Sequence, residues 1–360
     1  MSELDVLRNK IDELDRDILE LLNRRMQTSV AIGLVKRAMG SAVFDSNREY
    51  AVFEKLLGES LEMLIPESAV LDIYTAVIKA SRALQSDSKP GGAPKLFAVL
   101  GHPIGHSLSP AMHNRAFSFV NHNGLFFAVD TQDVGKSLKA LQDLDFGGAA
   151  VTMPHKESII DYLDEVVGVA KDIGAVNTVV NRDGKLWGYN TDSEGAMAAL
   201  KFRTELKGKT VLLVGAGGAA KALAYGLKAE KARLVITNRT QEKGEQLAKQ
   251  ADAVFLPPDE ILTMDYDVVI NATSVGMYPN VDEMPVPEEV FRENMVAMDI
   301  VYNPLRTMFM AKAISRGCVP LDGVTMFVHQ GGKQFELWTG LPAPLPMMRQ
   351  TVLSLLQRFK

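Results

Sequence analysis

The sequence changes character once, near residue 90, and this change limits the folds that the chain can adopt. Residues 86–94 are polar, contain proline and glycine, and show no hydrophobic periodicity, which is typical of a linker. Only helical patterns precede this linker, whereas short apolar runs alternate with helical segments after it. The 360-residue chain is therefore expected to be a multidomain protein with an all-α part followed by an α/β part.

The all-α part is expected to contain three helices. Leucine and isoleucine recur at steps of three and four, which predicts one long amphipathic helix over residues 3–39 with Gly40 as its C-cap. Further helices are expected at 45–57 and at 67–85, the last with Pro66 just ahead of it.

The α/β part is expected to form two lobes with mainly parallel sheets. The apolar runs expected as strands are 96–100, 125–129, 148–151, 175–180, 186–189, 211–214, 233–237, 267–270 and 296–302. Residues 324–338 and 343–359 are expected to be helices that return to the first lobe. A lobe that ended near Asp192 would otherwise lack covering helices.

Composition narrows the classes of function. A net charge of −5 offers no general attraction to nucleic acid, and no apolar run reaches the roughly 18 residues of a membrane span. The polar N-terminus has no signal-peptide core, and the single Cys318 cannot form an internal disulfide. We therefore expect a cytoplasmic protein with small-molecule partners. His102 and His106 are four residues apart, but Pro103 and Gly105 argue against a helical metal pair, so no metal site is expected.

A glycine-rich turn predicts a dinucleotide site. It follows the strand at 211–214, and the helix-compatible segment 221–231 comes after it. Glycine permits positive φ and lets backbone amides approach a pyrophosphate at a helix N-terminus. The residues of this turn are Gly215, Ala216, Gly217, Gly218 and Ala219.

The end of the next strand indicates which dinucleotide is bound. It reads Asn238-Arg239-Thr240, where NAD sites usually have Asp or Glu for the ribose 2′-hydroxyl. Arg239 can instead pair with a 2′-phosphate and stack on adenine. We expect NADP rather than NAD, and a bare α/β turn without cofactor is the alternative.

Two loops that follow strands carry further polar groups. Ser107 and Ser109 suit a polyol or a carboxylate ligand, although helix capping alone explains Ser109. In the second loop, Pro154 is expected to begin a helix with Lys156 in its first turn, where the helix dipole disfavours a lysine. An aspartate close by, Asp192, would keep this amine charged and oriented or share a proton with it. A solvated surface lysine is the alternative.

Residues 95–360 resemble the shikimate dehydrogenases along their whole length. The matching residues are Ser107-Leu-Ser109, Thr152-x-Pro154-x-Lys156, Gly174-Ala-Val-Asn177-Thr178, Asn190-Thr191-Asp192, the Gly215 turn, Asn238-Arg239-Thr240, Asn271-Ala-Thr273-Ser274, Tyr302 and Gln330-Gly-Gly-Lys-Gln334-Phe-x-Leu-Trp338. The resemblance implies a reversible, NADPH-dependent reduction of 3-dehydroshikimate to shikimate.

This resemblance also implies a role for each matching residue. Lys156 and Asp192 would manage the proton. The residues that would hold shikimate are Ser107, Ser109, Thr152, Asn177, Asp192, Tyr302 and Gln330. Those near the nicotinamide would be Thr273, Ser274 and Met326. Ala150 stands where the family often has asparagine, so one substrate hydrogen bond is missing or replaced, and quinate-like substrates stay open.

Residues 1–85 resemble the all-helical chorismate mutases. The matching residues are Leu7-Arg8-x-x-Ile11-Asp12-x-x-Asp15, Arg25, Gly33-x-x-Lys36, Asp45-x-x-Arg48-Glu49 and Ser81-x-x-x-Gln85. The resemblance implies the rearrangement of chorismate to prephenate. Arg8, Arg25 and Arg48 would bind carboxylates, Lys36 and Gln85 the ether oxygen, and Asp45 and Glu49 the hydroxyl region, with Ser81 completing the site. A non-catalytic helical module for dimerisation or effector binding is the alternative.

The spacing of two arginines predicts an assembly. Arg8 and Arg25 are 17 residues apart, about 25 Å along one helix, which is too far for one chorismate to span. If both contact one ligand, Arg8 comes from a second chain, so a homodimer with shared mutase sites is expected.

The two resemblances together imply a division of the chain. Residues 1–85 would form the mutase domain and 86–94 the linker. Residues 95–191 and 324–360 would form the shikimate domain, and 192–323 a Rossmann-like NADP domain.

Overall fold

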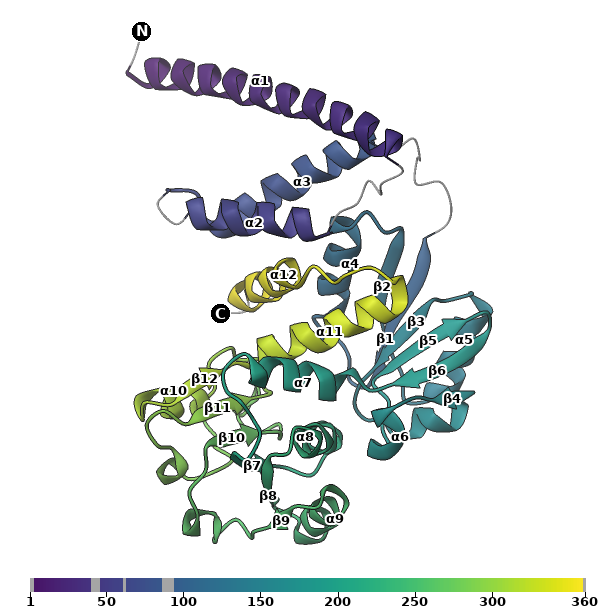
Figure 1. Ribbon diagram of the computed structural model, residues 1–360, viewed down its shortest axis with the longest axis vertical. Helices are drawn as coiled ribbons and strands as arrows, with labels where there is room; N and C mark the ends of the chain where they lie inside the picture. Colours follow the sequence, from purple (N-terminus) through teal and green to yellow (C-terminus); the bar gives the residue numbers. More distant parts are fainter. Residues whose placement is uncertain (1–2, 40–45, 61–62, 86–93, 359–360) are drawn as a thin grey trace. The chain divides into compact units, whose positions relative to one another are not determined.

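The chain divides into two compact units, which Figure 1 shows as a computed structural model describing residues 3–39, 46–60, 63–85 and 94–358. One unit contains the helical residues up to 94 together with 117–123. The other contains 95–116 and 124–360 and is an α/β structure. This arrangement confirms the expected fold class. None of the described helices is long and apolar enough to cross a membrane.

The helical unit is built around its third helix. Helices α1 (Glu3–Ala38) and α2 (Ser46–Ser60) both pack against α3 (Glu67–Gln85), and Phe53, Leu71 and Ile78 are buried. The first and third helices match their predicted bounds closely, whereas the second extends three residues beyond its predicted end. The first half of α1 keeps an apolar stripe in which every side chain is more than half exposed. Its members are Leu4, Leu7, Ile11, Leu14, Ile18 and Leu21.

The first lobe of the α/β unit contains a six-stranded mixed sheet in the order β2-β1-β3-β5-β6-β4. Its strands are β1 (Lys95–Gly101), β2 (Gly124–Asp130), β3 (Gly148–Val151), β4 (Glu165–Val166), β5 (Thr178–Arg182) and β6 (Lys185–Tyr189). Strand β5 runs antiparallel to both β3 and β6. The other five strands share one direction, so the sheet is mainly parallel, as predicted. Asp183 and Gly184 both have positive φ and form the two-residue turn of the β5–β6 hairpin.

Helices cover this sheet. One face packs against α5 (Val134–Asp143), the short 3-10 helix η1 (Ser158–Tyr162) and α6 (Val169–Ile173), with Leu138, Ile159 and Ala170 in the core. The lobe also includes α4 (Ser109–Phe119) and the C-terminal helices α11 (Gly323–Thr339) and α12 (Leu345–Arg358). The indole of Trp338 on α11 donates to the Val179 carbonyl of β5 at 3.0 Å. Helix α11 therefore packs on the first sheet.

The second lobe contains an all-parallel sheet in the order β9-β8-β7-β10-β11-β12. Its strands are β7 (Thr210–Val214), β8 (Arg233–Thr237), β9 (Val254–Phe255), β10 (Val268–Asn271), β11 (Val296–Asp299) and β12 (Val319–Leu321). Helices α8 (Gly218–Ala229), α9 (Gln241–Ala251) and α10 (Met308–Ser315) and the short η2 (Ile261–Thr263) and η3 (Glu288–Val290) complete it. This is the doubly wound Rossmann order, in which ligands bind where the strand order reverses, here between β7 and β10.

Two helices join the lobes. Helix α7 (Thr191–Lys201) lies beside α11, and a Cβ added at Gly195 would come within 2.6 Å of the Gln330 backbone nitrogen (Figure 1). Met326 at the start of α11 lies in the core of the second lobe, while Trp338 near its end lies on the first sheet. The polar middle of α11 is therefore held at the junction of the lobes.

Candidate active sites and family membership

Strand direction gathers the predicted substrate residues at one edge of the first sheet. Strands β1, β2 and β3 are parallel, so their carboxyl ends lie together. The start of β5 lies at the same edge because Thr178 pairs with Ala150, and the end of β6 does so because Tyr189 pairs with Thr178. The segments that carry Ser107, Thr152, Lys156, Asn177 and Asp192 all leave or enter the sheet at this edge.

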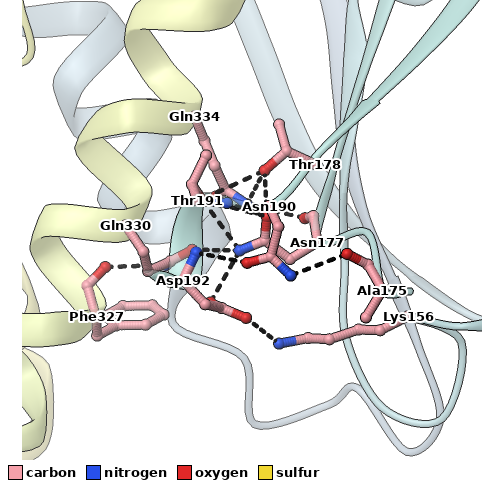
Figure 2. A network of polar contacts seen from close by, with 10 residues as sticks. All are labelled: Lys156, Ala175, Asn177, Thr178, Asn190, Thr191, Asp192, Phe327, Gln330 and Gln334. Atoms are coloured by element: carbon pink, nitrogen blue, oxygen red, sulfur yellow. Dashed lines mark hydrogen bonds and ion pairs between the residues drawn. The ribbon is translucent and has the colours of Figure 1, made fainter. Parts of the chain in front are cut away.

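A lysine and an aspartate form the centre of the edge. Lys156 Nζ lies 2.5 Å from Asp192 Oδ2, and their side chains are 19% and 9% exposed (Figure 2). Asp192 lies in the first turn of α7, where the N-cap Asn190 accepts its backbone N–H at 3.1 Å. The expected helix at Pro154 is absent: residues 153–157 form turns and η1 begins only at Ser158. The Lys156 carbonyl accepts from Val176 N at 2.7 Å, which fixes this turn against the start of β5.

A buried amide network holds the aspartate (Figure 2). Asn177 Nδ2 donates to Asp192 Oδ1 at 2.8 Å and to Thr191 Oγ1 at 3.0 Å. Asn177 Oδ1 accepts from Thr191 N and from the Thr178 hydroxyl, both at 2.8 Å. Both carboxylate oxygens of Asp192 are therefore bonded, one to the amide and one to the amine, which fixes its orientation.

Helix α11 supplies the opposite side of this network. Asn177 Nδ2 lies 3.5 Å from Gln330 Oε1, and the Gln330 amide donates to the Phe327 carbonyl at 2.9 Å. Gln334 Nε2 donates to the Thr178 hydroxyl and to the Asn177 carbonyl, both at 3.1 Å. Sequence reasoning gave Gln334 no role. Its position four residues after Gln330, on the same helix face, was the available signal.

The remaining predicted substrate residues flank this centre. The Ser107 hydroxyl accepts the Ser109 backbone N–H at 3.3 Å at the start of α4, and Thr152 lies directly beside Gly101. The ring of Tyr302 lies 4.8 Å from that of Phe327, and burial raises the pKa of its phenol.

A histidine beneath the network predicts a pH-dependent stability. His113 is fully buried, stacks on Phe126 at 4.6 Å and lies 5.1 Å from the ring of Trp338. Burial lowers its pKa from 6.5 to about 3, against a hydrogen bond with Gln334 that raises it. Near pH 6.5 the unfolded chain binds a proton at His113, whereas the folded chain does not bind it until the pH approaches 3. The contribution of His113 to the free energy of unfolding is therefore fully present above pH 6.5 and is lost as the pH falls toward 3.

We expect this loss to be about 1.4 kcal/mol per pH unit between pH 6 and pH 4, and we expect His113→Leu to lack it. Urea unfolding followed by tryptophan fluorescence is the measurement, since Trp187 and Trp338 are the two tryptophans of the chain and both lie in the α/β unit. Equal acid slopes for the two proteins would contradict this assignment.

The predicted dinucleotide turn joins β7 to α8. Gly215 has φ +119°, and a Cβ there would meet Thr273 Cγ2 at 3.0 Å, so a larger residue is excluded. A Cβ at Gly217, the N-cap of α8, would meet nothing within 4 Å. Open space before a helix N-terminus at a glycine-rich turn fits a pyrophosphate. Asn238, Arg239 and Thr240 follow β8, the next strand, and Arg239 is exposed there.

A second buried network holds Thr273, which is predicted to lie near the nicotinamide. Asn271 Oδ1 accepts from the Thr273 hydroxyl at 2.7 Å, and its amide donates to Asp299 Oδ1 at 3.0 Å. The Thr307 hydroxyl donates to Asp299 Oδ2 at 2.6 Å, and burial raises the pKa of Asp299 to about 6. Ser274 is exposed beside this network.

The two centres adjoin each other. A Cβ at Gly218 would lie 3.7 Å from Lys156 Cδ, so the lysine reaches the start of α8. The amine–carboxylate pair of the first lobe and the glycine turn of the second therefore border one region, at which hydride and proton transfer can be combined.

The helical unit brings together some of the residues that are predicted to bind its substrate. Arg25 Nη1 donates to the Ser81 hydroxyl, joining α1 to α3. Glu49 on α2 pairs with the buried Arg82, whose Nε donates to Glu49 Oε1 at 2.6 Å. Sequence reasoning missed Arg82, although an arginine next to Ser81 on an apolar helix face was a signal.

The other predicted binding residues of this unit are exposed, partly exposed or outside the described residues. Arg8 and Arg48 are exposed and Lys36 is partly exposed. Asp45 and the side chain of Gln85 lie outside the described residues. Arg8 and Arg25 lie far apart on the single helix α1.

Comparison with known proteins identifies the α/β unit. A shikimate dehydrogenase (NADP(+)) of Pyrococcus furiosus is 41% identical over 275 residues, which are 75% of this chain and 99% of the relative. The chain belongs to the shikimate dehydrogenase family. Family models agree: the shikimate dehydrogenase substrate-binding domain matches residues 99–179, shikimate/quinate 5-dehydrogenase 196–301, and the shikimate 5′-dehydrogenase C-terminal domain 323–353.

The N-terminal unit is a chorismate mutase type II domain, whose family model matches residues 7–86. Solved structures are also similar to this chain. A Thermus thermophilus shikimate 5-dehydrogenase in complex with NADP(H) and shikimate is 37% identical, with a TM-score of 0.68 over 72% of this chain and 99% of that one. A chorismate mutase/shikimate 5-dehydrogenase fusion protein from Clostridium acetobutylicum is 30% identical, with a TM-score of 0.68 over 74% of this chain and 98% of that one.

Proposed function

We propose that the chain is a bifunctional enzyme that reduces 3-dehydroshikimate to shikimate with NADPH, reversibly, and rearranges chorismate to prephenate. The observation that carries the first activity is the contact of Lys156 with Asp192 beside the glycine turn of the dinucleotide lobe. The shared fold and the 41% identity to an NADP(+)-dependent shikimate dehydrogenase support it. We also propose that the enzyme works in the cytoplasm, as the free, buried Cys318 allows.

In the dehydrogenase reaction, Lys156 handles a proton, and bound NADPH would supply the hydride to the carbonyl carbon. Lys156 Nζ donates the proton to the substrate oxygen in the direction of reduction and accepts it in the direction of oxidation. Asp192 holds the amine in place through its 2.5 Å contact, and Asn177 holds Asp192. A donor fixed in this way requires little reorganisation during the reaction.

The substrate would lie along the edge of the first sheet. Ser107 and Ser109 would present hydroxyls to a carboxylate. The hydroxyls of Thr152 and Tyr302 and the amide of Gln330 would contact the ring hydroxyls. Ala150 is buried in β3 and pairs with Thr178, so it adds no polar group beside Asn177. Shikimate is the proposed substrate. Rates with quinate and with shikimate, compared side by side, measure how strictly a site with Ala150 selects shikimate.

NADP is the proposed cofactor, with its pyrophosphate at residues 215–219, its 2′-phosphate at Asn238, Arg239 and Thr240, and its nicotinamide near Thr273, Ser274 and Met326. Arg239→Ala is expected to raise the KM for NADPH about 10- to 100-fold, since one charge-assisted contact to phosphate is lost. The KM for NADH should change much less, because NADH has no 2′-phosphate. Initial rates with each cofactor provide the measurement, and equal increases in both KM values would refute the role.

The mutase activity needs neither a nucleophile nor a metal, because the rearrangement occurs within one molecule. The site must fold chorismate into a compact chair and stabilise charge on the breaking ether bond. Arg25 and Arg48 would bind carboxylates, Lys36 and Gln85 the ether oxygen, and Asp45, Glu49 and Ser81 would complete the site. The contact of Arg25 with Ser81 and the pairing of Glu49 with Arg82 support this proposal.

We further propose that the chain forms a homodimer through α1. The exposed stripe from Leu4 to Leu21 is the kind of apolar surface that a second copy would cover. Arg8 is too far from Arg25 along α1 to share a ligand with it in one chain, so the partner's Arg8 would complete each mutase site.

A paired assay of the purified chain tests the whole proposal. We expect loss of chorismate with formation of prephenate, and reduction of NADP⁺ with shikimate, in the same preparation. An active dehydrogenase that leaves chorismate unchanged would leave the helical unit as a non-catalytic module. Faster oxidation of quinate than of shikimate would overturn the substrate assignment.

A further inference from the structure

We propose that Glu157 and Lys221 form a clasp between the two lobes and position the dinucleotide turn against Lys156 for the dehydrogenase reaction. This inference rests on the proposed dehydrogenase function and adds a positioning pair to it. Lys221 Nζ lies 2.6 Å from Glu157 Oε1, although the residues are 64 positions apart and belong to different lobes.

Each member of the clasp is adjacent to a reacting centre. Glu157 directly follows Lys156 in the turn at 153–157, and Lys221 lies in the first turn of α8, which begins at Gly218. Lys156 itself passes 3.7 Å from a Cβ placed at Gly218. The ion pair therefore joins the two short segments whose separation sets the distance between the amine and the cofactor turn.

Apolar contacts between the two lobes lie next to the ion pair. Ala222, next to Lys221, is buried with Ile173 and Ala175 in a small core cluster, against which Val169 and Tyr225 also pack. Residues 169–175 are in the first lobe and Ala222 is in the second. The lobes are thus in contact next to the ion pair, so a movement of one lobe relative to the other would change the distance between Glu157 and Lys221.

The position of Lys221 is electrostatically unfavourable without a partner. The positive end of the helix dipole disfavours a cation in the first turn of α8. Its side chain is only 27% exposed, so water can compensate only in part, whereas Glu157 is 61% exposed and free to follow it. The carboxylate of Glu157, from the other lobe, offsets this cost only while the two lobes keep the relative position that holds it beside Lys221.

The expected effect is on turnover more than on binding. Hydride transfer depends steeply on the alignment of reacting atoms, so the loss of a weak clasp is amplified in the rate. We expect Glu157→Gln and Lys221→Met each to lower the dehydrogenase kcat about 5- to 20-fold, with the KM for shikimate changed less than about 2-fold.

A charge exchange distinguishes the clasp from a general structural effect. We expect the single reversals Glu157→Lys and Lys221→Glu to lower kcat further, and the double variant to recover to within about 3-fold of the native rate at saturating shikimate and NADP⁺. Lys201→Met, which removes the comparable 2.8 Å pair with Glu230, is the matched control and should leave both activities unchanged.

The outcomes are separable. If the native chain fails to oxidise shikimate, the proposed function fails. If the native chain is active but the double reversal gives no recovery, Lys221 acts alone, for example on cofactor phosphate, and the clasp is overturned. A normal kcat for Glu157→Gln overturns it as well. The mutase rate of each preparation reports the amount of active protein independently.

Discussion

Replacing Lys156 by alanine is expected to lower the turnover of the dehydrogenase about 10²-fold or more. The amine is the only basic side chain that contacts Asp192 among the described residues, and it borders the glycine turn. Without it, the substrate oxygen must exchange its proton with water instead of with a positioned amine. The KM values should change less than kcat, because other groups hold the substrate and the cofactor.

The second active site of the chain provides a control for this variant. Lys156→Ala should leave prephenate formation at the native rate, which excludes a general folding defect. Lys139→Ala, which removes an exposed lysine of α5, should leave both activities unchanged. Steady-state kinetics with shikimate and NADP⁺ across pH 6–9 provide the measurement. A Lys156→Ala enzyme with near-normal kcat would refute the proton-transfer role.

Replacing Arg25 by alanine is expected to abolish prephenate formation while shikimate oxidation continues. Arg25 is partly buried between α1 and α3, where it bonds to Ser81. A desolvated guanidinium that binds a substrate carboxylate contributes about 2–5 kcal/mol, which corresponds to a loss of 30-fold to several thousandfold. The rate of chorismate loss provides the measurement, and Arg24→Ala, which changes the exposed neighbour, is the matched control.

Mixing two inactive variants tests whether the mutase site is shared. Arg8→Ala and Arg25→Ala should each lack mutase activity alone. If dimers exchange subunits freely, half are mixed and one of the two sites in each is intact, so about one quarter of the native activity should return. No recovery from fully exchanged dimers, or full activity in a strictly monomeric protein, would contradict the shared site.

Much of the fold was predictable because its patterns are local. The long helix predicted over 3–39 is α1, Glu3–Ala38, since an apolar residue every three or four positions is compatible with few other structures. The strand at 211–214, the glycine turn and the following helix were also expected. The antiparallel β5–β6 hairpin was not, although Asp183-Gly184 is a recognised hairpin turn. Strand β5 starts at Thr178 rather than 175, because Ala175 and Val176 bond to Asn190 and Lys156 instead.

The residues of the site were easier to predict than the contacts that hold them in place. Lys156 and Asp192 were paired from the sequence, and they lie in contact. The helix expected at Pro154 is wrong, because the chain turns there to bond with the start of β5. The contacts of Gln334, Arg82 and Lys221 join segments that are 33 or more residues apart, and no local pattern in the sequence indicated which residue each of them contacts. Met326 was expected near the nicotinamide, and its side chain is 6% exposed within the core of the second lobe.

The two active sites of the chain are expected to be chemically independent, and one paired experiment can decide whether they are. Chorismate loss and shikimate-dependent NADP⁺ reduction should be measured on the same preparations of the native chain, Lys156→Ala and Arg25→Ala. We predict a reciprocal result, in which each variant loses one activity and keeps the other near the native rate. The loss of both activities in either variant, or of neither in both, would contradict the account.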